Sequence, residues 1–154
     1  METCSFAMNI IKYLVYVIDS AGIHIDPKKV QILKDCPIPQ NIHEVRSFLG
    51  LANFYRQLIL GFSHITWPLN RLMKGNGKKI FKWTLTQQQD FEQIKNKLCT
   101  APVLVLPDLH QPFEIEMDAS DYALGAVITQ SGHLVMFHSE NFSETVRMYS
   151  MYEK

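Results

Sequence analysis

Phe113-Glu-Ile-Glu-Met-Asp-Ala-Ser120 is the most informative stretch of this 154-residue sequence. Apolar and acidic residues alternate along it, with Phe113, Ile115 and Met117 between Glu114, Glu116 and Asp118. This period of two predicts a β-strand with one buried face. Asp118 ends the acidic face. A carboxylate at the end of a rigid strand is a good metal ligand, because its position is fixed before an ion arrives.

Further strand patterns lie on both sides of this stretch. Downstream, Gly125–Gln130 and His133–Ser139 flank the hairpin signal Ser131-Gly132, so three antiparallel strands are expected. Phe142–Lys154 contains no helix breaker and is expected to begin a helix. Upstream, Val103–Leu106 predicts a short strand. Near the N-terminus, a hairpin is predicted from strands at Tyr13–Ile18 and Ile23–Ile25 around the turn Asp19–Gly22.

Helix signals fill most of the region between residues 26 and 100. Asp26-Pro27 predicts the start of a short helix that ends before Pro37. Asn41 and Glu44 form a capping-box pattern, and apolar residues then recur at helical spacing. The predicted later helices are Glu44 to about Leu60 with Gly61 as C-cap, Ser63–Lys74 with Ser63 as N-cap, and Gln87–Leu98 with Thr86 as N-cap.

Composition narrows the class of protein. The sequence is 47% hydrophobic and 19% charged, which is typical of a globular protein, and it has no 18-residue apolar run, so no membrane span is predicted. Three well-separated cysteines, Cys4, Cys36 and Cys99, fit a reduced intracellular protein without a disulfide framework or zinc site. Residues 1–100 carry 13 basic and 7 acidic residues, and residues 101–154 carry 2 and 8. This asymmetry has two interpretations. The basic N-terminal part contacts a polyanion such as nucleic acid, or the basic and acidic parts of the chain attract each other.

Two clusters each have a functional and a structural interpretation. Basic and aromatic residues mix around residues 74–83, which suits single-stranded nucleic acid, unless the aromatics instead pack into a core. The members are Lys74, Lys78, Lys79, Phe81, Lys82 and Trp83.

The second cluster is the acidic face of the Phe113 strand. Its acids lie about 6.8 Å apart, whereas a two-metal site needs ions about 3.5–4 Å apart. Asp118 therefore needs acids from other elements, and Glu114 and Glu116 alternatively form an exposed face.

Many of these segments, in collinear order, resemble one family: the reverse transcriptase and ribonuclease H of gypsy-type long-terminal-repeat retrotransposons. The most specific match is Glu44–Arg56, which resembles the thumb helix of that family. The other matching segments are Thr3–Ala7, Tyr13-Leu14, Val17-Ile18, Gly22-Ile23, Asp26–Val30, Phe62–Leu72, Phe81–Trp83, Ala101–Leu104, Pro107-Asp108, Asp118–Ser120, Gly125–Val127, Gln130, Tyr149-Ser150 and Tyr152–Lys154.

The resemblance implies an α+β fold in three parts. Residues 1–25 correspond to a palm-end, primer-grip-like hairpin and residues 26–80 to a helical thumb-like segment. Residues 81–154 correspond to the first half of a ribonuclease H-like domain, with three antiparallel strands and the start of a helix. At the primer grip, Val15 and Tyr16 stand where the family usually has Gly and His.

The resemblance also assigns site residues. Asp118 corresponds to the first of four acids that bind Mg²⁺ and catalyse RNA hydrolysis in ribonuclease H. The nucleic-acid-binding residues expected from the resemblance and the charge pattern are Tyr13, Tyr16, Arg46, Arg56, Lys78, Lys79 and Lys82. The polymerase aspartates would precede Met1, and the other three ribonuclease H acids would follow Lys154.

The implied parent reaction is DNA synthesis on an RNA template, with hydrolysis of RNA in RNA–DNA hybrids. The partner of the parent enzyme is RNA–DNA hybrid or DNA. With one ribonuclease H carboxylate, this chain is expected to be catalytically inactive alone. Two alternatives stay open for its behaviour: a non-catalytic nucleic-acid-binding remnant, or a protein-interaction fragment that self-associates through exposed strand edges.

Overall fold

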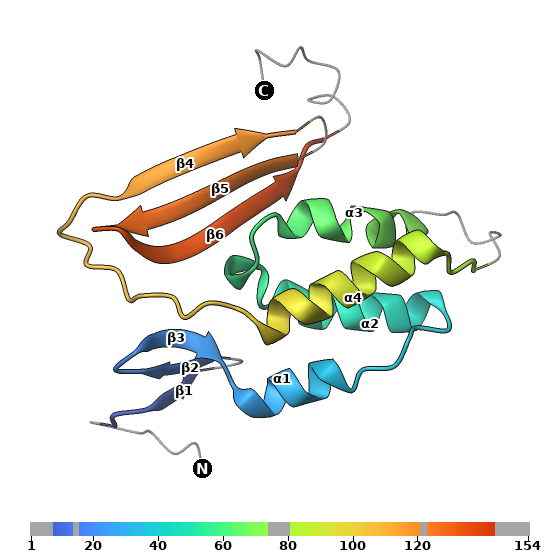
Figure 1. Ribbon diagram of the computed structural model, residues 1–154, viewed down its shortest axis with the longest axis horizontal. Coiled ribbons are helices and arrows are strands. Elements are labelled where there is room, and N and C mark those ends of the chain that lie inside the picture. Colours follow the sequence, from blue (N-terminus) through green and yellow to red (C-terminus); the bar gives the residue numbers. More distant parts are fainter. Residues whose placement is uncertain (1–7, 14–15, 74–80, 121–122, 144–154) are drawn as a thin grey trace.

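A computed structural model describes residues 8–13, 16–73, 81–120 and 123–143. The described parts form two three-stranded antiparallel sheets and four α-helices, so the predicted α+β class is confirmed. In Figure 1 the helices α2, α3 and α4 are grouped together, the C-terminal sheet lies along α3, and the small N-terminal sheet lies near α1. No helix among the described residues is long and apolar enough to span a membrane.

The N-terminal sheet contains one strand more than predicted. Its strands, in spatial order, are β1 (Ile11–Tyr13), β2 (Tyr16–Asp19) and β3 (Gly22–Ile25). The prediction of one strand over Tyr13–Ile18 is wrong, because Tyr13 pairs with Tyr16 across β1 and β2. Periodicity alone does not detect this reversal, because both halves are rich in strand-forming residues.

The first two helices begin where their caps predict. Helix α1 (Pro27–Lys34) starts after Asp26, whose carboxylate accepts the N–H of Lys28 at 3.0 Å. Helix α2 (Ile42–Asn53) starts after Asn41, whose side chain accepts the N–H of Glu44 at 2.9 Å. Both contacts satisfy N–H groups that lack a partner within their helix.

Helix α2 ends before the predicted Leu60. The Phe54 carbonyl accepts a hydrogen bond from the Tyr16 hydroxyl, and the N–H of Leu58 bonds to the Tyr55 carbonyl at 2.9 Å instead of continuing the α-helical ladder. The chain therefore tightens into the 3₁₀-helix η1 (Arg56–Leu58). Gly61, predicted to end this helix, instead immediately precedes the next one and has a φ of 69°.

The two later helices begin one or two residues away from their predicted starts. Helix α3 (Phe62–Met73) includes Ser63 in its first turn, so Ser63 is not its N-cap. Helix α4 (Leu85–Cys99) is capped by Thr84 rather than Thr86, with Gln87 completing the capping box. Thr84 and Gln87 are three residues apart, like Asn41 and Glu44, and form the same kind of capping box. This box starts α4 two residues before the predicted cap Thr86.

The C-terminal sheet confirms the three predicted strands. They are β4 (Glu114–Ala119), β5 (Ala123–Gln130) and β6 (His133–Asn141), in the spatial order β4-β5-β6. The prediction of a buried face on β4 is wrong, because all six of its residues are exposed and no described element covers its apolar side. The helix predicted over Phe142–Lys154 lies almost wholly outside the described residues.

A single core joins the helices to both sheets. Its fully buried residues come mainly from α1–α4, with Tyr55, Ile59 and Leu104 from the connections. The strand predicted over Val103–Leu106 is instead a single bridge, in which Leu104 exchanges hydrogen bonds of 2.7 and 2.9 Å with Ile23. The next residue, Val105, donates to the Leu134 carbonyl at 2.9 Å, so this connection contacts both sheets.

Candidate nucleic-acid interface and the Asp118 cavity

A groove of about 280 Å³ runs between α2 and α3. Its lining combines apolar side chains with one cationic and two amide side chains: Arg46, Leu49, Gly50, Asn53, Phe62, Thr66, Asn70 and Met73. The buried face of α2 supports this geometry, because Val45, Phe48, Leu49 and Ala52 anchor the helix in the core and turn the opposite face to solvent.

The solvent face of α2 carries an arginine, a glycine and an aromatic residue that follow one another at intervals of one helical turn. Arg46 and Gly50 are exposed one turn apart, and Phe54, one turn further on, is 59% exposed. A Cβ added at Gly50 would meet no other atom within 4 Å, so the helix backbone is open to solvent at this point. A cation, an accessible backbone and an aromatic ring in line form a surface that a second polymer can approach closely.

The predicted site residues of the N-terminal sheet differ in exposure. Tyr13 on β1 is 62% exposed. Tyr16 on β2 is half-buried: its hydroxyl donates to the Phe54 carbonyl, and its ring packs edge-on against Tyr55 at 5.8 Å between centroids. Burial raises the pKa of Tyr16 above its usual value of 10.0. Tyr16 therefore ties the hairpin to the end of α2.

The remaining predicted nucleic-acid residues do not gather in one place. Arg46 lines the groove, whereas the guanidinium of Arg56 donates to the backbone carbonyl of Ser139 on β6. Lys82 is exposed, and Lys78 and Lys79 lie outside the described residues.

The aromatics next to Lys82 pack on the core. Phe81 stacks with Trp83 at 6.1 Å between centroids, and Trp83 meets Phe91 edge-on at 6.0 Å. The indole N–H of Trp83 donates to Gln88 at 2.8 Å. These contacts favour the structural interpretation of the two aromatics over base stacking.

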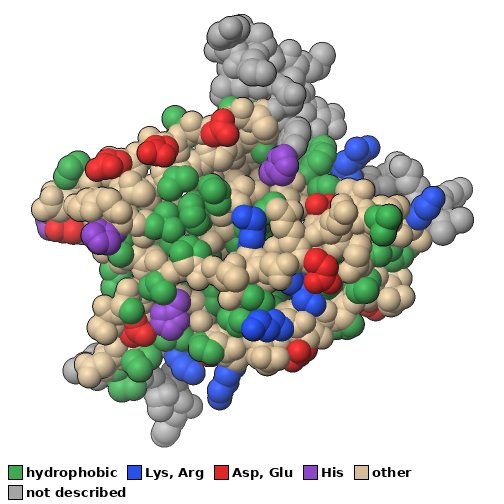
Figure 2. Space-filling model, in the orientation of Figure 1, with side chains coloured by type: hydrophobic (Ala, Val, Ile, Leu, Met, Phe, Trp, Pro, Cys, Tyr) green, Lys and Arg blue, Asp and Glu red, His purple; other side chains and the backbone are tan. Residues whose placement is uncertain are grey.

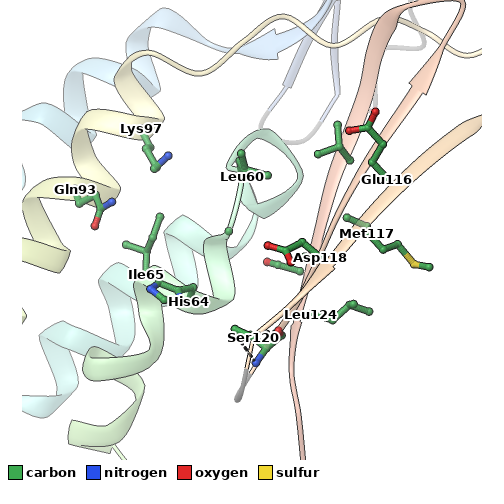
Figure 3. Close-up of a pocket in the computed structure, with 16 residues that line it drawn as sticks. Leu60, His64, Ile65, Gln93, Lys97, Glu116, Met117, Asp118, Ser120 and Leu124 are labelled. Carbon is green, nitrogen blue, oxygen red and sulfur yellow. Dashed lines mark hydrogen bonds between the residues drawn. The ribbon is translucent and has the colours of Figure 1, made fainter. Parts of the chain in front are cut away.

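Asp118 faces a cavity of about 570 Å³ between the C-terminal sheet and the helices. Figure 3 shows Asp118 pointing from β4 toward the helices, while Met117 points to the other side of the sheet. The helical wall carries His64 and Ile65 from α3 and Gln93 and Lys97 from α4. Glu116 lines the same cavity, so two carboxylates and one lysine border one space.

The described residues do not form a metal site around Asp118. They contain no group of three or more His, Cys, Asp or Glu side chains that could hold an ion. Glu116 and Asp118 are separated by two strand positions, about 6.8 Å, which is too far to grip one Mg²⁺ in octahedral geometry. Asp118 as a Mg²⁺ ligand therefore stays a prediction, and the described residues beside it do not complete a site for the ion.

Figure 2 shows a row of acidic side chains over β4 and a mixture of basic and acidic side chains over the helices. Asp118 and Arg46, which the sequence analysis predicts as site residues, line the larger cavity and the groove respectively, and so do Lys97 and Gly50, which it does not predict. The position of Gly50 inside an amphipathic helix is the signal that could have identified it. Glycine disfavours a helix, so a glycine at such a position usually has a role in packing or function.

The chain resembles known proteins over its whole length. The family model of the RNase H-like domain found in reverse transcriptase matches residues 83–154. Those residues therefore belong to that domain family, and the chain as a whole is similar to part of retrotransposon Pol polyproteins, among them that of transposon gypsy.

The relatives span the whole chain but are far longer than it. The Retrovirus-related Pol polyprotein from transposon 297 of Drosophila melanogaster is 34% identical over 154 residues, which cover 100% of this chain and 14% of that protein. The polyprotein from transposon gypsy of the same organism is 30% identical and is matched over 99% of this chain and 16% of its own length.

Solved structures confirm the fold. The foamy viral protease-reverse transcriptase in complex with dsDNA superposes with a TM-score of 0.82 and 24% identity, over 95% of this chain and 31% of that one. The same viral enzyme in complex with RNA/DNA hybrid gives a TM-score of 0.81 and 24% identity, over 92% of this chain and 20% of that one.

Proposed function

We propose that these 154 residues are a duplex-contacting part of a reverse transcriptase and that the face of α2 with the adjoining α2–α3 groove is the contact surface. The parent reaction is DNA synthesis on an RNA template with removal of the RNA strand. The observation that carries the proposal is the exposed series Arg46, Gly50 and Phe54 beside the amide side chains of Asn53 and Asn70.

Each member of this surface suits a nucleic-acid backbone or groove. The Arg46 guanidinium suits phosphate oxygens, which it can bind through two parallel hydrogen bonds. Gly50 lets the strand or sugar edge approach the helix backbone, and the amides of Asn53 and Asn70 can donate to sugar or base-edge acceptors. The related viral enzyme has been solved with dsDNA and with RNA/DNA hybrid, which supports a duplex as the ligand.

Fluorescence anisotropy with a labelled RNA–DNA hybrid tests this function. We expect the logarithm of the association constant to fall linearly with the logarithm of the salt concentration, because phosphate contacts release counterions. The slope of this line is the salt slope. Arg46→Gln is expected to weaken binding and to reduce the salt slope by about 1. Lys29→Gln, which removes an exposed charge from α1, is the matched control and is expected to change the slope far less. Equal effects of the two variants on binding would show that Arg46 does not contact the duplex.

We further propose that a polypeptide of these 154 residues does not hydrolyse RNA. Hydrolysis of a phosphodiester by two metal ions needs carboxylates around both ions, and the described residues place no such group beside Asp118. An end-labelled hybrid incubated with Mg²⁺ or Mn²⁺ is expected to stay intact with the wild-type chain and with Asp118→Asn. Metal-dependent cleavage that Asp118→Asn abolishes would contradict this.

A further inference from the structure

The C-terminal end of α2 is held by a residue from the N-terminal sheet. The last carbonyl groups of a helix have no donor within that helix. Phe54 is the C-cap residue of α2, and its carbonyl accepts the hydroxyl of Tyr16, 38 residues earlier in the chain. The N–H of Leu58 bonds to the Tyr55 carbonyl instead. Tyr16 therefore supplies the donor at the point where α2 ends.

Tyr16 is itself fixed in position. It lies on the central strand of the order β1-β2-β3 and pairs with Tyr13 on one side and Ile25 on the other. Its ring meets that of Tyr55 edge-on, at 83° between the ring planes, and Tyr55 is fully buried. Burial raises the pKa of the Tyr16 hydroxyl above 10.0, so the hydroxyl keeps its proton at neutral pH and remains a hydrogen-bond donor.

The residue that Tyr16 holds is also the end of the proposed contact surface. Phe54 follows Arg46 and Gly50 on the solvent face of α2, and it is 59% exposed. A side chain this exposed has few neighbours to direct it, so its direction depends on the backbone that carries it. That backbone is the end of a helix, where the chain frays unless the end groups are satisfied. The Tyr16 hydroxyl satisfies the carbonyl of the same residue whose ring meets solvent.

We propose that Tyr16 is a positioning residue of the duplex interface. Its hydroxyl fixes the last turn of α2, and this turn directs the Phe54 ring toward the duplex. This role rests on the proposed function, because it requires the solvent face of α2 to contact a duplex. Since the Phe54 carbonyl engages the hydroxyl, Tyr16 acts on nucleic acid through the helix end rather than through a hydrogen bond of its own.

A double-mutant cycle on RNA–DNA hybrid binding tests this role. Tyr16→Phe removes only the hydroxyl and keeps the ring that packs on Tyr55. In anisotropy titrations we expect it to weaken binding about threefold, which is a modest coupling for residues in contact. Phe54→Ala alone is expected to weaken binding more, because it removes the ring itself. In the Phe54→Ala background, Tyr16→Phe is expected to have no further effect.

Arg46 provides the comparison for the cycle. It lies two helical turns from Phe54, about 12 Å along α2, so the two sites are far enough apart to act independently. The effects of Tyr16→Phe and Arg46→Gln on the association constant are therefore expected to multiply. A general loss of stability would instead weaken binding in every background alike.

Tyr55→Phe is the matched control for the loss of a hydroxyl. The Tyr55 hydroxyl is buried at the same junction but has no hydrogen-bond partner among the described residues, so this variant is expected to bind like wild type. The ¹³C chemical shift of the Phe54 carbonyl gives a second readout on the free chain. It is expected to change far more in Tyr16→Phe than in Tyr55→Phe.

The positioning role is overturned if Tyr16→Phe binds the hybrid as wild type does, or if its effect persists in full in the Phe54→Ala background. The second result would indicate a direct contact or a general loss of stability. Failure of the proposed function gives a different pattern, in which Arg46→Gln and Phe54→Ala both leave binding unchanged. The positioning role then falls together with the interface, even if the carbonyl shift shows the hydrogen bond.

Discussion

The backbone N–H of Ser63 donates a buried hydrogen bond of 3.0 Å to the side-chain hydroxyl of Ser139, 76 residues further along the chain. Ser63 is the second residue of α3, where N–H groups have no acceptor within the helix, and the preceding Gly61 has no side chain that could cap it. Strand β6 thus supplies the cap of α3. Together with the Arg56 contact to the Ser139 carbonyl, this bond fixes the C-terminal sheet against the helices.

Ser139→Ala is expected to lower the free energy of unfolding by about 1–2 kcal/mol, because it leaves the Ser63 N–H buried without an acceptor. Ser139 is 3% exposed, so water does not readily replace the hydroxyl. Chemical denaturation followed by circular dichroism measures the change. Ser47→Ala, at an exposed position of α2, is the control and is expected to stay within about 0.5 kcal/mol of wild type. A Ser139→Ala variant as stable as the control would contradict the capping role.

Gly22→Ala is expected to destabilise the fold by about 1–3 kcal/mol. Gly22 has a φ of 131°, and an added Cβ would lie 2.1 Å from the carbonyl oxygen of Leu104, which accepts the N–H of Ile23 at 2.7 Å. The methyl group must therefore open the bridge between β3 and residue 104. Gly132→Ala separates backbone strain from this clash, because Gly132 also has a positive φ but nothing lies within 4 Å of its added Cβ. Equal losses of stability in the two variants would remove the steric argument.

The pair of Asp19 and His24 predicts a pH-dependent contribution to stability. The imidazole Nε2 of His24 lies 2.9 Å from the Asp19 carboxylate, and this hydrogen bond raises the pKa of His24 above 6.5 and, with the N–H of Ala21, lowers that of Asp19 below 3.8. The His24 contribution is complete below pH 6.5 and is lost as pH rises through its folded pKa. The Asp19 contribution is present above pH 3.8 and is lost as pH falls through its folded pKa.

The pair is thus expected to stabilise the fold most between those two values. NMR titration of the His24 ring measures the shift, and Asp19→Asn is expected to return its pKa toward 6.5. An unchanged His24 pKa in that variant would show that the carboxylate is not the cause.

Local interactions explain what the sequence predicted well. Asn41 with Glu44, and Asp26 with Pro27, are neighbours in the chain, so their caps follow from residue type and spacing. The alternation around Ile115 likewise predicted the existence of β4. Asp118 is a candidate site residue from its place at the end of the strand pattern as well as from the family resemblance, and Arg46 is one from the resemblance and the charge pattern.

Long-range contacts explain what the sequence did not show. The cap of α3 comes from Ser139, and the bridge of Leu104 comes from Ile23, so neither is encoded in a local pattern. Alternation on β4 predicted a buried face, but burial depends on a covering element, and none of the described elements supplies one. Lys97 borders the Asp118 cavity only because α4 packs beside α3.

Gly50 allows the most direct test of the proposed duplex interface. Gly50→Leu fills the open face of α2, yet helix propensity favours Leu over Gly by about 1 kcal/mol, so the variant is expected to fold at least as stably as wild type. Gln89→Leu, at an exposed position of α4, is the matched control. In anisotropy titrations with an RNA–DNA hybrid, we predict that Gly50→Leu weakens binding about tenfold or more and that Gln89→Leu leaves it unchanged, since a bulky side chain holds the duplex away from the helix. A folded Gly50→Leu chain that binds the hybrid as tightly as wild type would contradict the account.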